Sequence, residues 1–296
     1  RPVAALAGAA GLEIGPGGGI LVDERGCTSD PSICAAGDCA EFSCERRRVL
    51  PLGSIANRTG RLVANTIAGV EDTMPCLLGS EVIKVFDLHV GCCGETASRL
   101  RAEEVGVEEV WGAFTDRAPF YPEAATVRLK VIRETEGPLR GLQVVSGGAV
   151  VRWVNTFAQI LDLAGGEAGA LGRLEHAYAP TCATALDPLH TMASILESGP
   201  EMQLPPDAFL DGGEKGWTVV NMLTEAERNR VGLPALVGRV VEMDLAALRT
   251  DWRDLPERGV VTVCAKGGRS YEAARFLRDK GIEARYLAGG IGFYNV

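Results

Sequence analysis

The chain has 296 residues, a length that predicts about two domains at roughly 150 residues per domain. Hydrophobic residues make up 46% and charged residues 23% of the sequence, the balance of a globular protein rather than a disordered chain. No uncharged run is longer than eleven residues, which argues against an integral membrane protein because a membrane span needs roughly 20. The net charge of −9 argues against nucleic acid or an anionic membrane as a partner.

The nine cysteines predict a reducing, cytoplasmic compartment. Their number is odd in a long chain with an ample core, which is not typical of a disulfide framework. Cys27, Cys34, Cys39 and Cys44 follow one another without a Cys-x-x-Cys pair or a nearby histidine. We therefore expect no zinc site there.

The first 70 residues predict short elements separated by turn residues. Apolar residues at near-helical spacing indicate the helices, and short apolar runs bounded by glycine or proline indicate the strands. The elements are a short amphipathic helix ended by Gly11, a glycine turn over 15–19, strands over 19–23 and 32–35, and a helix over 55–68. Because Arg1 stands where a starting methionine would, we expect the chain to begin partway through a longer protein.

The remaining residues predict two blocks joined by a linker. Residues 79–198 alternate β-rich runs with helices and include a hairpin at RETEGPLRG. Residues 199–213 are rich in proline, glycine and acidic residues, which is typical of a linker. The last block alternates strands at 217–222, 259–265 and 284–287 with helices at 224–231, 243–251 and 270–280. This alternation predicts an α/β domain with a parallel sheet.

The first signal with chemical meaning ends in Ala35-Ala36-Gly37-Asp38. Small residues allow a ligand to approach the backbone closely, and the carboxylate of Asp38 can accept hydrogen bonds from a sugar-alcohol hydroxyl beside a phosphate. A bare motif of this kind also fits an aspartate that caps a turn. The longer string TSDPSICAAGDC, preceded by GGILVD, closely resembles the second flavin-contacting segment of the pyridine-nucleotide disulfide oxidoreductases.

This resemblance implies a flavin site in the first 70 residues. In that family the aspartate that matches Asp38 holds the ribityl and pyrophosphate part of FAD. The segment Leu50-Pro51-Leu52-Gly53-Ser54 matches the one that passes the isoalloxazine ring, and the following helix begins behind it. The candidate cofactor-binding residues are therefore Gly37, Asp38, Pro51, Leu52 and Gly53.

Residues 71–198 resemble the α+β dimerisation domain of one subgroup, the coenzyme A-disulfide reductases and their NADH oxidase and persulfide reductase relatives. The turns Phe120-Tyr121-Pro122 and His176-Ala177-Tyr178-Ala179-Pro180 carry the match. In that subgroup, tyrosines from two such turns reach across a dimer toward the partner's redox cysteine. The resemblance thus implies roles for Tyr121 and Tyr178, and the alternative is two buried tyrosines that pack on prolines.

Two features of that family are absent from the sequence. No G-x-G-x-x-G loop precedes a helix, and none of the nine cysteines has the surroundings of the family's redox cysteine. The resemblance therefore implies that residues 1–70 are the C-terminal tail of a flavin-binding domain with its flavin-facing helix. Most of the flavin half was either removed or never present.

The second signal is the loop Cys264-Ala-Lys-Gly-Gly-Arg-Ser270, between a predicted strand and a predicted helix. Unpaired backbone N–H groups and the positive end of the helix dipole favour a thiolate on Cys264. The side chains of Lys266 and Arg269 add positive charge. A thiolate placed in this way is a good nucleophile and can carry a persulfide, whereas a structural cysteine would need neither the glycines nor the cations.

This loop and Gly289-Gly290-Ile291 strongly resemble a rhodanese-like sulfurtransferase domain over residues 214–296. The sequence has Asn221-Met222-Leu223 where the family usually has Asp-Val-Arg, residues that brace the domain. The catalytic loop matches, so the resemblance implies Cys264, Arg269 and Lys266 as catalytic residues, with slow turnover.

The two resemblances occur together in coenzyme A-disulfide reductases fused to rhodanese. They imply FAD and NAD(P)H as cofactors, coenzyme A as a substrate or ligand, a small-molecule disulfide or persulfide substrate, and a homodimer. A different class of function is also open, a dimeric scaffold with a sulfur-relay domain and no flavin. An oxygen-reducing NADH oxidase is a third interpretation, which the rhodanese-like domain disfavours.

Overall fold

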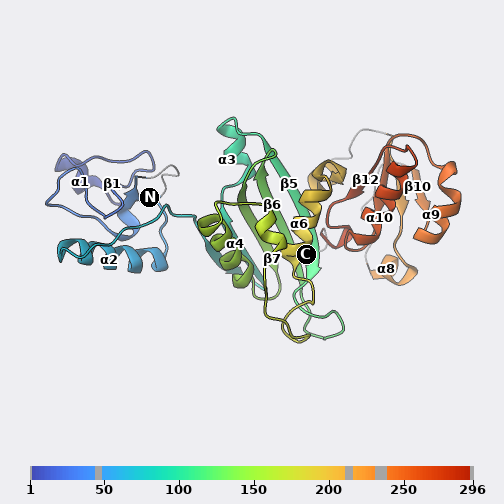
Figure 1. Cartoon of the computed structure of the whole chain (residues 1–296), viewed down its shortest axis with the longest axis horizontal. Helices are drawn as coiled ribbons and strands as arrows, with labels where there is room; N and C mark the ends of the chain where they lie inside the picture. Colours follow the sequence, from blue (N-terminus) through green and yellow to red (C-terminus); the bar gives the residue numbers. More distant parts are fainter. Residues whose placement is uncertain (1, 44–48, 211–215, 231–238, 294–296) are drawn as a thin grey trace. The chain divides into compact units, whose positions relative to one another are not determined.

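The computed structural model describes residues 2–43, 49–210, 216–230 and 239–293. Contacts divide the chain into unit 1, Arg1–Glu81, and unit 2, Val82–Val296, and each unit is described by itself (Figure 1). The predicted domain boundary at residue 71 lies too early, because Met74 and Leu77 pack in the core of unit 1. The backbone N–H of Met74 also donates to the carbonyl of Glu24 at 2.7 Å.

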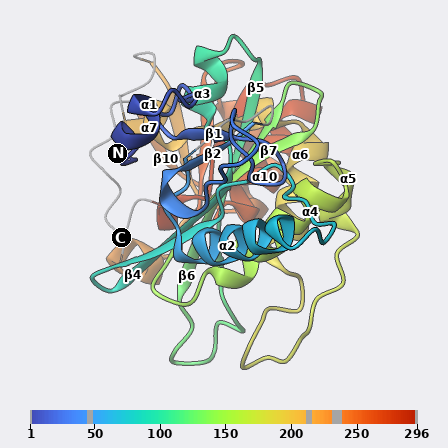
Figure 2. The same ribbon diagram turned by 90° about the vertical axis from the view of Figure 1, so that its left-hand side faces the viewer.

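Unit 1 consists of a short parallel sheet, one long helix and connecting turns (Figure 2). Its elements are α1 (Ala5–Ala9), β1 (Ile20–Val22), the 3-10 turn η1 (Gly37–Cys39), β2 (Ala40–Phe42) and α2 (Gly53–Ile67). Strands β1 and β2 pair in parallel, and α2 packs on η1. Both predicted helices, the first strand and the glycine turn are confirmed, with α2 ending just before Gly69.

The predicted strand over residues 32–35 is wrong. The segment makes only an isolated bridge, whereas β2 pairs with β1. Sequence patterns miss β2 because Glu41 lies at its centre, yet its side chain is fully buried. The Glu41 carboxylate accepts hydrogen bonds from the backbone N–H groups of Gly17 and Gly19, both at 3.1 Å. Buried charge is tolerated when it is paired in this way.

Unit 2 contains a five-stranded antiparallel sheet in the order β3-β4-β7-β6-β5. The strands are β3 (Glu81–Val85), β4 (Leu88–Gly94), β5 (Val107–Thr115), β6 (Thr126–Glu134) and β7 (Leu139–Ser146). The helices are α3 (Ala97–Ala102), α4 (Val151–Leu163), α5 (Gly169–Gly172) and α6 (Pro188–Ser198). Helix α4 covers β4 and β7 with buried Trp153 and Phe157, and α6 packs on β5.

The predicted hairpin between β6 and β7 and the helix after it are confirmed. Strand β5 was not assigned from the sequence, because it carries Glu108 and Glu109. Their charges pair with Arg133 and Lys130 on the neighbouring strand β6. A cross-strand ion pair lets a strand keep charged side chains that weaken its hydrophobic pattern.

Unit 2 also contains a parallel sheet, which with its helices we call the C-terminal lobe, residues 199–293. Its strands are β8 (Gln203–Leu204), β9 (Thr218–Asn221), β10 (Arg239–Glu242), β11 (Val260–Val263) and β12 (Ala284–Leu287), in the order β10-β9-β11-β12-β8. Its helices are α7 (Pro206–Leu210), α8 (Glu225–Arg230), α9 (Leu245–Asp251) and α10 (Gly268–Asp279), with 3-10 turns η2 (Pro200–Met202), η3 (Trp252–Asp254) and η4 (Ile291–Phe293). The predicted parallel sheet is confirmed.

The prediction that residues 199–213 form a linker is wrong for its described part, residues 199–210. Strand β8 pairs in parallel with β12 and completes the sheet. Phe209 of α7 is buried in a core cluster with Leu287. The prolines and glycine that suggested a linker begin helical turns and end α6.

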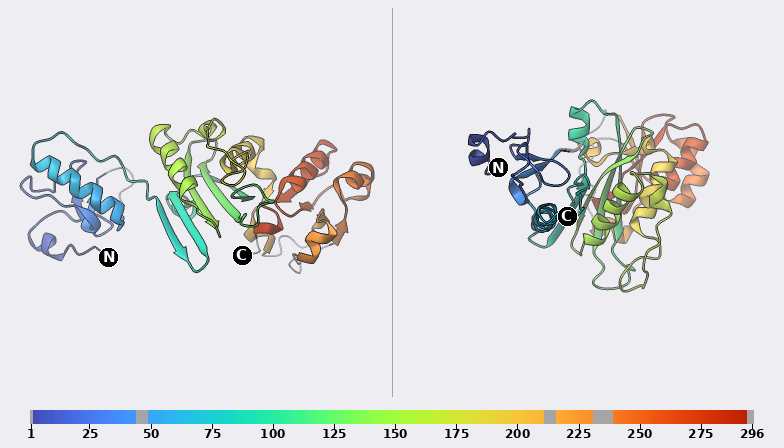
Figure 3. Two further views of the ribbon diagram at one scale, coloured as in Figure 1. Left: turned by 90° about the horizontal axis from the view of Figure 1, so that it is seen from below. Right: turned by 60° about the vertical axis from the view of Figure 1, so that its left-hand side comes forward.

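The C-terminal lobe packs against the strand-β5 side of the antiparallel sheet (Figure 3). The side-chain amide of Gln203 bonds both the N–H and the carbonyl of Trp111, at 2.9 and 2.8 Å. The Trp111 ring meets Phe293 edge-on, with 5.4 Å between centroids. Arg128 donates to the carbonyls of Gly292 and Phe293, and burial lowers its pKa. These contacts hold the two sheets of unit 2 together.

Candidate functional site

Cys264 follows β11 at the carboxyl edge of the parallel sheet, where the chain turns into α10. Its Sγ atom accepts hydrogen bonds from the N–H of Gly267 at 3.2 Å and the N–H of Ser270 at 3.4 Å. The Ser270 hydroxyl lies 3.2 Å from the sulfur. Cys264 is only 1% exposed. Donors arranged around one buried sulfur stabilise a thiolate or a persulfide anion.

Two glycines allow the backbone to close around this sulfur. Gly267 has φ +96° and Gly290, after β12, has φ +63°, both in the left-handed region. A Cβ at Gly290 would lie 2.4 Å from the Cys264 carbonyl oxygen. The N–H of Ile291 donates to that carbonyl at 2.9 Å. The ends of β11 and β12 are thus joined directly through the candidate site.

Arg269 is fixed by two partners. Its guanidinium donates to the Met222 carbonyl at 2.9 Å and to the Glu227 carboxylate of α8. The hydrogen bond with Glu227 raises the pKa of Arg269, and the field of Cys264 adds to this. For Glu227, burial raises the pKa, but hydrogen bonds with Arg269 and Thr224 outweigh it and the net shift is downward. Arg269 therefore joins α8 to the cysteine loop as well as placing a cation near Cys264.

Asn221 is part of a second brace beside this one. Its side-chain amide donates to Glu242 at 3.0 Å, and its side-chain oxygen accepts from the N–H of Leu223 at 3.1 Å. Arg228 of α8 reaches the same Glu242 carboxylate and also donates to the Leu223 carbonyl at 3.0 Å. The strand end that departs from the rhodanese pattern is therefore still fixed by hydrogen bonds.

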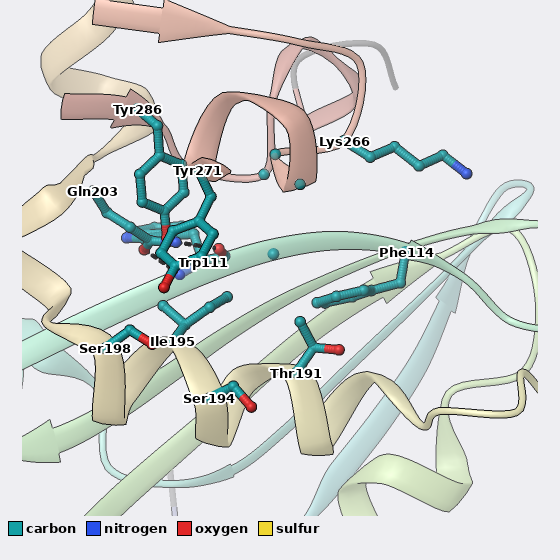
Figure 4. A pocket seen from close by; sticks show the side chains of 14 residues that line it. Trp111, Phe114, Thr191, Ser194, Ile195, Ser198, Gln203, Lys266, Tyr271 and Tyr286 are labelled. Carbon is teal, nitrogen blue, oxygen red and sulfur yellow. Dashed lines mark hydrogen bonds between the residues drawn. The ribbon is translucent and has the colours of Figure 1, made fainter. Parts of the chain in front are cut away.

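A pocket of about 160 Å³ lies between the C-terminal lobe and α6 (Figure 4). Tyr271 and Tyr286 point into it beside Trp111, and Ile195 and Ser198 project from α6. A hydrogen bond with Ser198 lowers the pKa of Tyr271, whereas burial raises that of Tyr286. The wall is mostly apolar and aromatic.

The pocket borders the cysteine loop without including its sulfur. Gly267, Gly268 and Lys266 contribute to the lining, and Cys264 does not. The long side chain of Lys266 extends away from Tyr271 and Tyr286 in Figure 4. Lys266 is exposed as a residue. Neighbouring atoms nevertheless desolvate its ammonium group in part, which lowers the pKa of that group.

The two predicted tyrosine turns lie together in unit 2. The N–H of Ala118 in the first turn donates to the carbonyl of Pro180 in the second at 3.1 Å. Tyr178 is 53% exposed, and Tyr121 is partly buried beside the ring of Phe120. The alternative of two buried tyrosines is therefore wrong for Tyr178, because its ring is open to solvent.

Arg152 joins these turns and was missed from the sequence. From α4 it donates to the carbonyls of Asp116 at 2.6 Å and Cys182 at 2.7 Å, and its guanidinium lies over Trp153. No local motif marks this arginine, because its partners are main-chain atoms of distant loops.

In unit 1 the candidate flavin residues come together at one end of α2. Gly37, with φ +73°, donates its N–H to the Thr59 hydroxyl at 3.0 Å. Leu52 is the N-cap of α2 and provides no side-chain hydrogen bond to its first turn. The side chains of Asp38 and Pro51 and the backbone of Gly53 are exposed.

These residues fit part of a flavin. An uncapped helix N-terminus attracts negative charge, and an exposed carboxylate accepts hydroxyl hydrogen bonds. Thr59, which fixes Gly37, is fully buried and was not among the cofactor-binding residues predicted from the sequence. Across the ranges that the structure describes, no group of three or more His, Cys, Asp or Glu residues could hold a metal ion.

Cys76 is disulfide-bonded, which differs from the prediction that the cysteines are reduced. Cys27, Cys34, Cys39, Cys182 and Cys264 are free thiols. The sequence cannot indicate such a bond, because pairing depends on chain segments that only the fold brings together.

No described helix is long and apolar enough to cross a membrane.

Comparison with known proteins shows similarity to one family. Residues 1–60 match the model of the pyridine nucleotide-disulphide oxidoreductases. The chain is 32% identical over 196 residues to a protein named NADH oxidase from Methanocaldococcus jannaschii, covering 65% of this chain and 43% of that protein. It is 32% identical over 201 residues to an NAD(P)H coenzyme A polysulfide/persulfide reductase from Pyrococcus horikoshii, covering 67% and 45%.

A solved structure extends the similarity to nearly the whole chain. The NAD-dependent persulfide reductase from A. fulgidus matches with a TM-score of 0.88 and 30% identity, over 99% of this chain and 54% of that one. The chain therefore spans about half the length of the proteins that it resembles.

Replacing Gly290 by alanine tests whether the close approach of β12 shapes the cysteine loop. The new Cβ would meet backbone atoms of Cys264, Lys266 and Gly267 within 2.7 Å. We expect the free energy of unfolding to fall by at least about 1–2 kcal/mol, the cost of a left-handed non-glycine residue, and alkylation of Cys264 to change. Gly268→Ala is the matched control, since nothing lies within 4 Å of its Cβ. Denaturant titration measures the free energy of unfolding, and mass spectrometry measures the alkylation of Cys264. If Gly290→Ala and Gly268→Ala behave alike, the close approach of β12 does not shape the cysteine loop.

Proposed function

We propose that this chain belongs to the pyridine nucleotide-disulphide oxidoreductases and is the C-terminal portion of a reductase of coenzyme A disulfide, coenzyme A persulfide or polysulfide. The observation that carries the proposal is the match of 99% of the chain to a persulfide reductase structure. Relatives named for coenzyme A-dependent polysulfide and persulfide reduction support the substrate class. The sequence lacks a phosphate-binding glycine loop, which supports a separate segment for that part of the cofactor.

The cofactors of this reductase are FAD and NAD(P)H, and one similar structure is described as FAD-dependent. Bound FAD supplies hydride and electron transfer between the nicotinamide and a redox cysteine. In this chain Asp38 would accept hydrogen bonds from the ribityl hydroxyls, and Gly37 would allow the cofactor to approach the backbone. Pro51, Leu52 and Gly53 would face the ring system, with the uncapped N-terminus of α2 next to them.

The C-terminal lobe is a rhodanese-like domain that handles sulfane sulfur at Cys264. The Cys264 thiolate attacks the outer sulfur of thiosulfate, the S–S bond of thiosulfate breaks, and sulfite leaves with the electron pair. A persulfide then remains on Cys264. The N–H groups of Gly267 and Ser270 stabilise negative charge on either sulfur form, and Arg269 contributes its positive charge.

The reductase works as a homodimer in the cytoplasm. The exposed ring of Tyr178, next to the turn with Tyr121, is available to a second copy, where a phenol could donate to a thiolate or persulfide. Light scattering of the purified chain at micromolar concentration should give the mass of a dimer. A monomer mass would contradict this part of the proposal.

An NADH oxidase is the second candidate, favoured by the relative of that name from Methanocaldococcus jannaschii. The cysteine loop disfavours it, because reduction of oxygen requires no sulfane sulfur carrier. The scaffold interpretation without flavin predicts a colourless protein even when the upstream coding sequence is included. Spectroscopy of that longer protein separates a scaffold from a flavoprotein.

The flavin prediction concerns Asp38. Purified alone, this chain should retain no stoichiometric flavin after gel filtration, because it lacks the loop that normally holds the pyrophosphate. In a reductase that includes this loop, Asp38→Asn should weaken flavin retention about tenfold, which corresponds to about 1.4 kcal/mol. Glu71→Gln, which changes another exposed acid of unit 1, is the control. Stoichiometric absorbance in the chain alone, or normal retention by Asp38→Asn, would contradict the flavin assignment.

The sulfur prediction concerns Cys264. Thiosulfate or polysulfide should add sulfane sulfur to Cys264 in preference to the other eight cysteines. Arg269→Ala should slow loading about tenfold, because both its charge and its bond to Glu227 are lost, and Lys266→Ala should act more weakly. Arg249→Ala breaks a surface ion pair of the same lobe and should leave the rate unchanged. Peptide mass spectrometry measures loading, and persulfide spread evenly over the cysteines would make the lobe a docking module.

A further inference from the structure

Cys27 and Cys34 face each other in unit 1, at a place that the proposed reductase and sulfurtransferase chemistry does not use. They form an isolated antiparallel bridge between two chain segments. Both are free thiols and both are partly exposed, so a small molecule can reach them.

The backbone hydrogen bonds around the pair define its geometry. The N–H of Thr28 donates to the Ile33 carbonyl, and the N–H of Ala35 donates to the Gly26 carbonyl, both at 3.0 Å. These bonds flank the cysteines, which therefore occupy a non-hydrogen-bonded position of the ladder. At such positions the Cα atoms lie about 4.5 Å apart and the side chains are closest.

This spacing falls within the range of about 4.4–6.8 Å between Cα atoms that disulfides require. The Cys34 thiol is close enough to the Cys27 thiol to contribute to the raised pKa of Cys27. The backbone is thus arranged for a bond between the two sulfurs without having to move. The N–H of Cys27 donates to the Asp23 carboxylate at 2.8 Å, which helps to hold this arrangement.

We propose that Cys27 and Cys34 form a reversible cross-strand disulfide, which makes unit 1 a thiol–disulfide site of its own. The oxidant is a low-molecular-weight disulfide. The idea that this oxidant belongs to the enzyme's own substrate class rests on the proposed function. The formation of the Cys27–Cys34 bond does not.

The exchange takes two steps. The Cys34 thiolate attacks one sulfur of the external disulfide, whose S–S bond breaks and releases one thiol after protonation. The Cys27 thiolate then attacks the Cys34 sulfur, breaks the mixed disulfide and releases the second thiol. Two cysteine thiols are oxidised and one external disulfide is reduced to two thiols.

The order of the steps follows from the surroundings of Cys27. Burial raises the pKa of its thiol, the Asp23 carboxylate and Cys34 act in the same direction, and Arg25 opposes them. A thiol that resists ionisation is the weaker first nucleophile. Its attack becomes intramolecular once Cys34 carries the mixed disulfide, which offsets that disadvantage.

The bond would restrain the segment that leads to the candidate flavin residues. Cys34 precedes Gly37 by three positions, and Gly37 is already fixed by Thr59. Closing the loop over residues 28–33 removes conformations from the unfolded chain and so stabilises unit 1. The oxidised form of unit 1, which carries Gly37 and Asp38, should therefore be more stable to unfolding than the reduced form.

The test uses the purified chain and oxidised glutathione, with no flavin and no sulfane sulfur. After incubation, free thiols are blocked with N-ethylmaleimide and the protein is digested without reduction. We expect Cys27 and Cys34 to escape alkylation together, with a loss of about 2 Da, two hydrogens. Acid cleavage at Asp30-Pro31 should leave the two fragments joined until reductant is added.

Matched variants decide the outcome. Cys34→Ser should prevent the internal bond and leave Cys27 as a thiol or a glutathione adduct, whereas Cys39→Ser should leave the bond intact. Under the same oxidant, Cys34→Ser should unfold roughly 5 °C below wild type. Alkylation of both cysteines in the oxidised wild type, separate glutathione adducts, or a bond to Cys39 would overturn the proposal. Loading of Cys264 by thiosulfate remains a separate measurement, so failure of either proposal can be recognised.

Discussion

The approach of Gly290 to the Cys264 carbonyl is the constraint on which the candidate sulfur site depends. It lets two neighbouring parallel strands end at the same place, and the Ile291 N–H then binds the carbonyl that would otherwise be unpaired. With that carbonyl held, the next peptide groups are free to turn their N–H groups toward the sulfur. The same segment continues into η4, whose carbonyls accept from Arg128 of the antiparallel sheet. One backbone contact thus links the sulfur to the packing of unit 2.

Buried charge in this chain is compensated by the backbone as much as by opposite charge. Glu41 is held by the N–H groups of a glycine turn and Arg128 by two carbonyls, and the half-buried Arg152 is held in the same way by carbonyls of two separate loops. Each of these groups therefore fixes the course of a loop rather than of a helix or strand. This is why the turns with Gly19, Pro180 and Gly292 keep defined positions although none of them lies in a sheet.

The sequence predicts the elements whose apolar residues repeat regularly, and it fails where a polar group has a distant partner. Helix α2 and the strands of the parallel sheet follow from their periodicity, and the loop at Cys264 follows from its glycines. Strand β2 was missed because Glu41 looks exposed until the glycine turn is placed beside it. Strand β8 was missed because two residues between prolines resemble a linker, and only β12 makes them a strand. Glu227 and Thr59 could not be found locally, since their partners Arg269 and Gly37 are 42 and 22 residues away.

At Asn221 the sequence departs from the rhodanese pattern that it was predicted to follow, and the structure shows which groups brace this strand end. The sequence alone suggests a weakened domain, because the aspartate and arginine of the rhodanese pattern are missing. In the structure, Glu227 binds Arg269, and Arg228 with Asn221 shares the carboxylate of Glu242. At this strand end β10 supplies the acid, Glu242, and α8 supplies the base, Arg228. The strand end beside the cysteine loop is therefore held by ion pairs and hydrogen bonds, although the aspartate and arginine of the rhodanese pattern are absent.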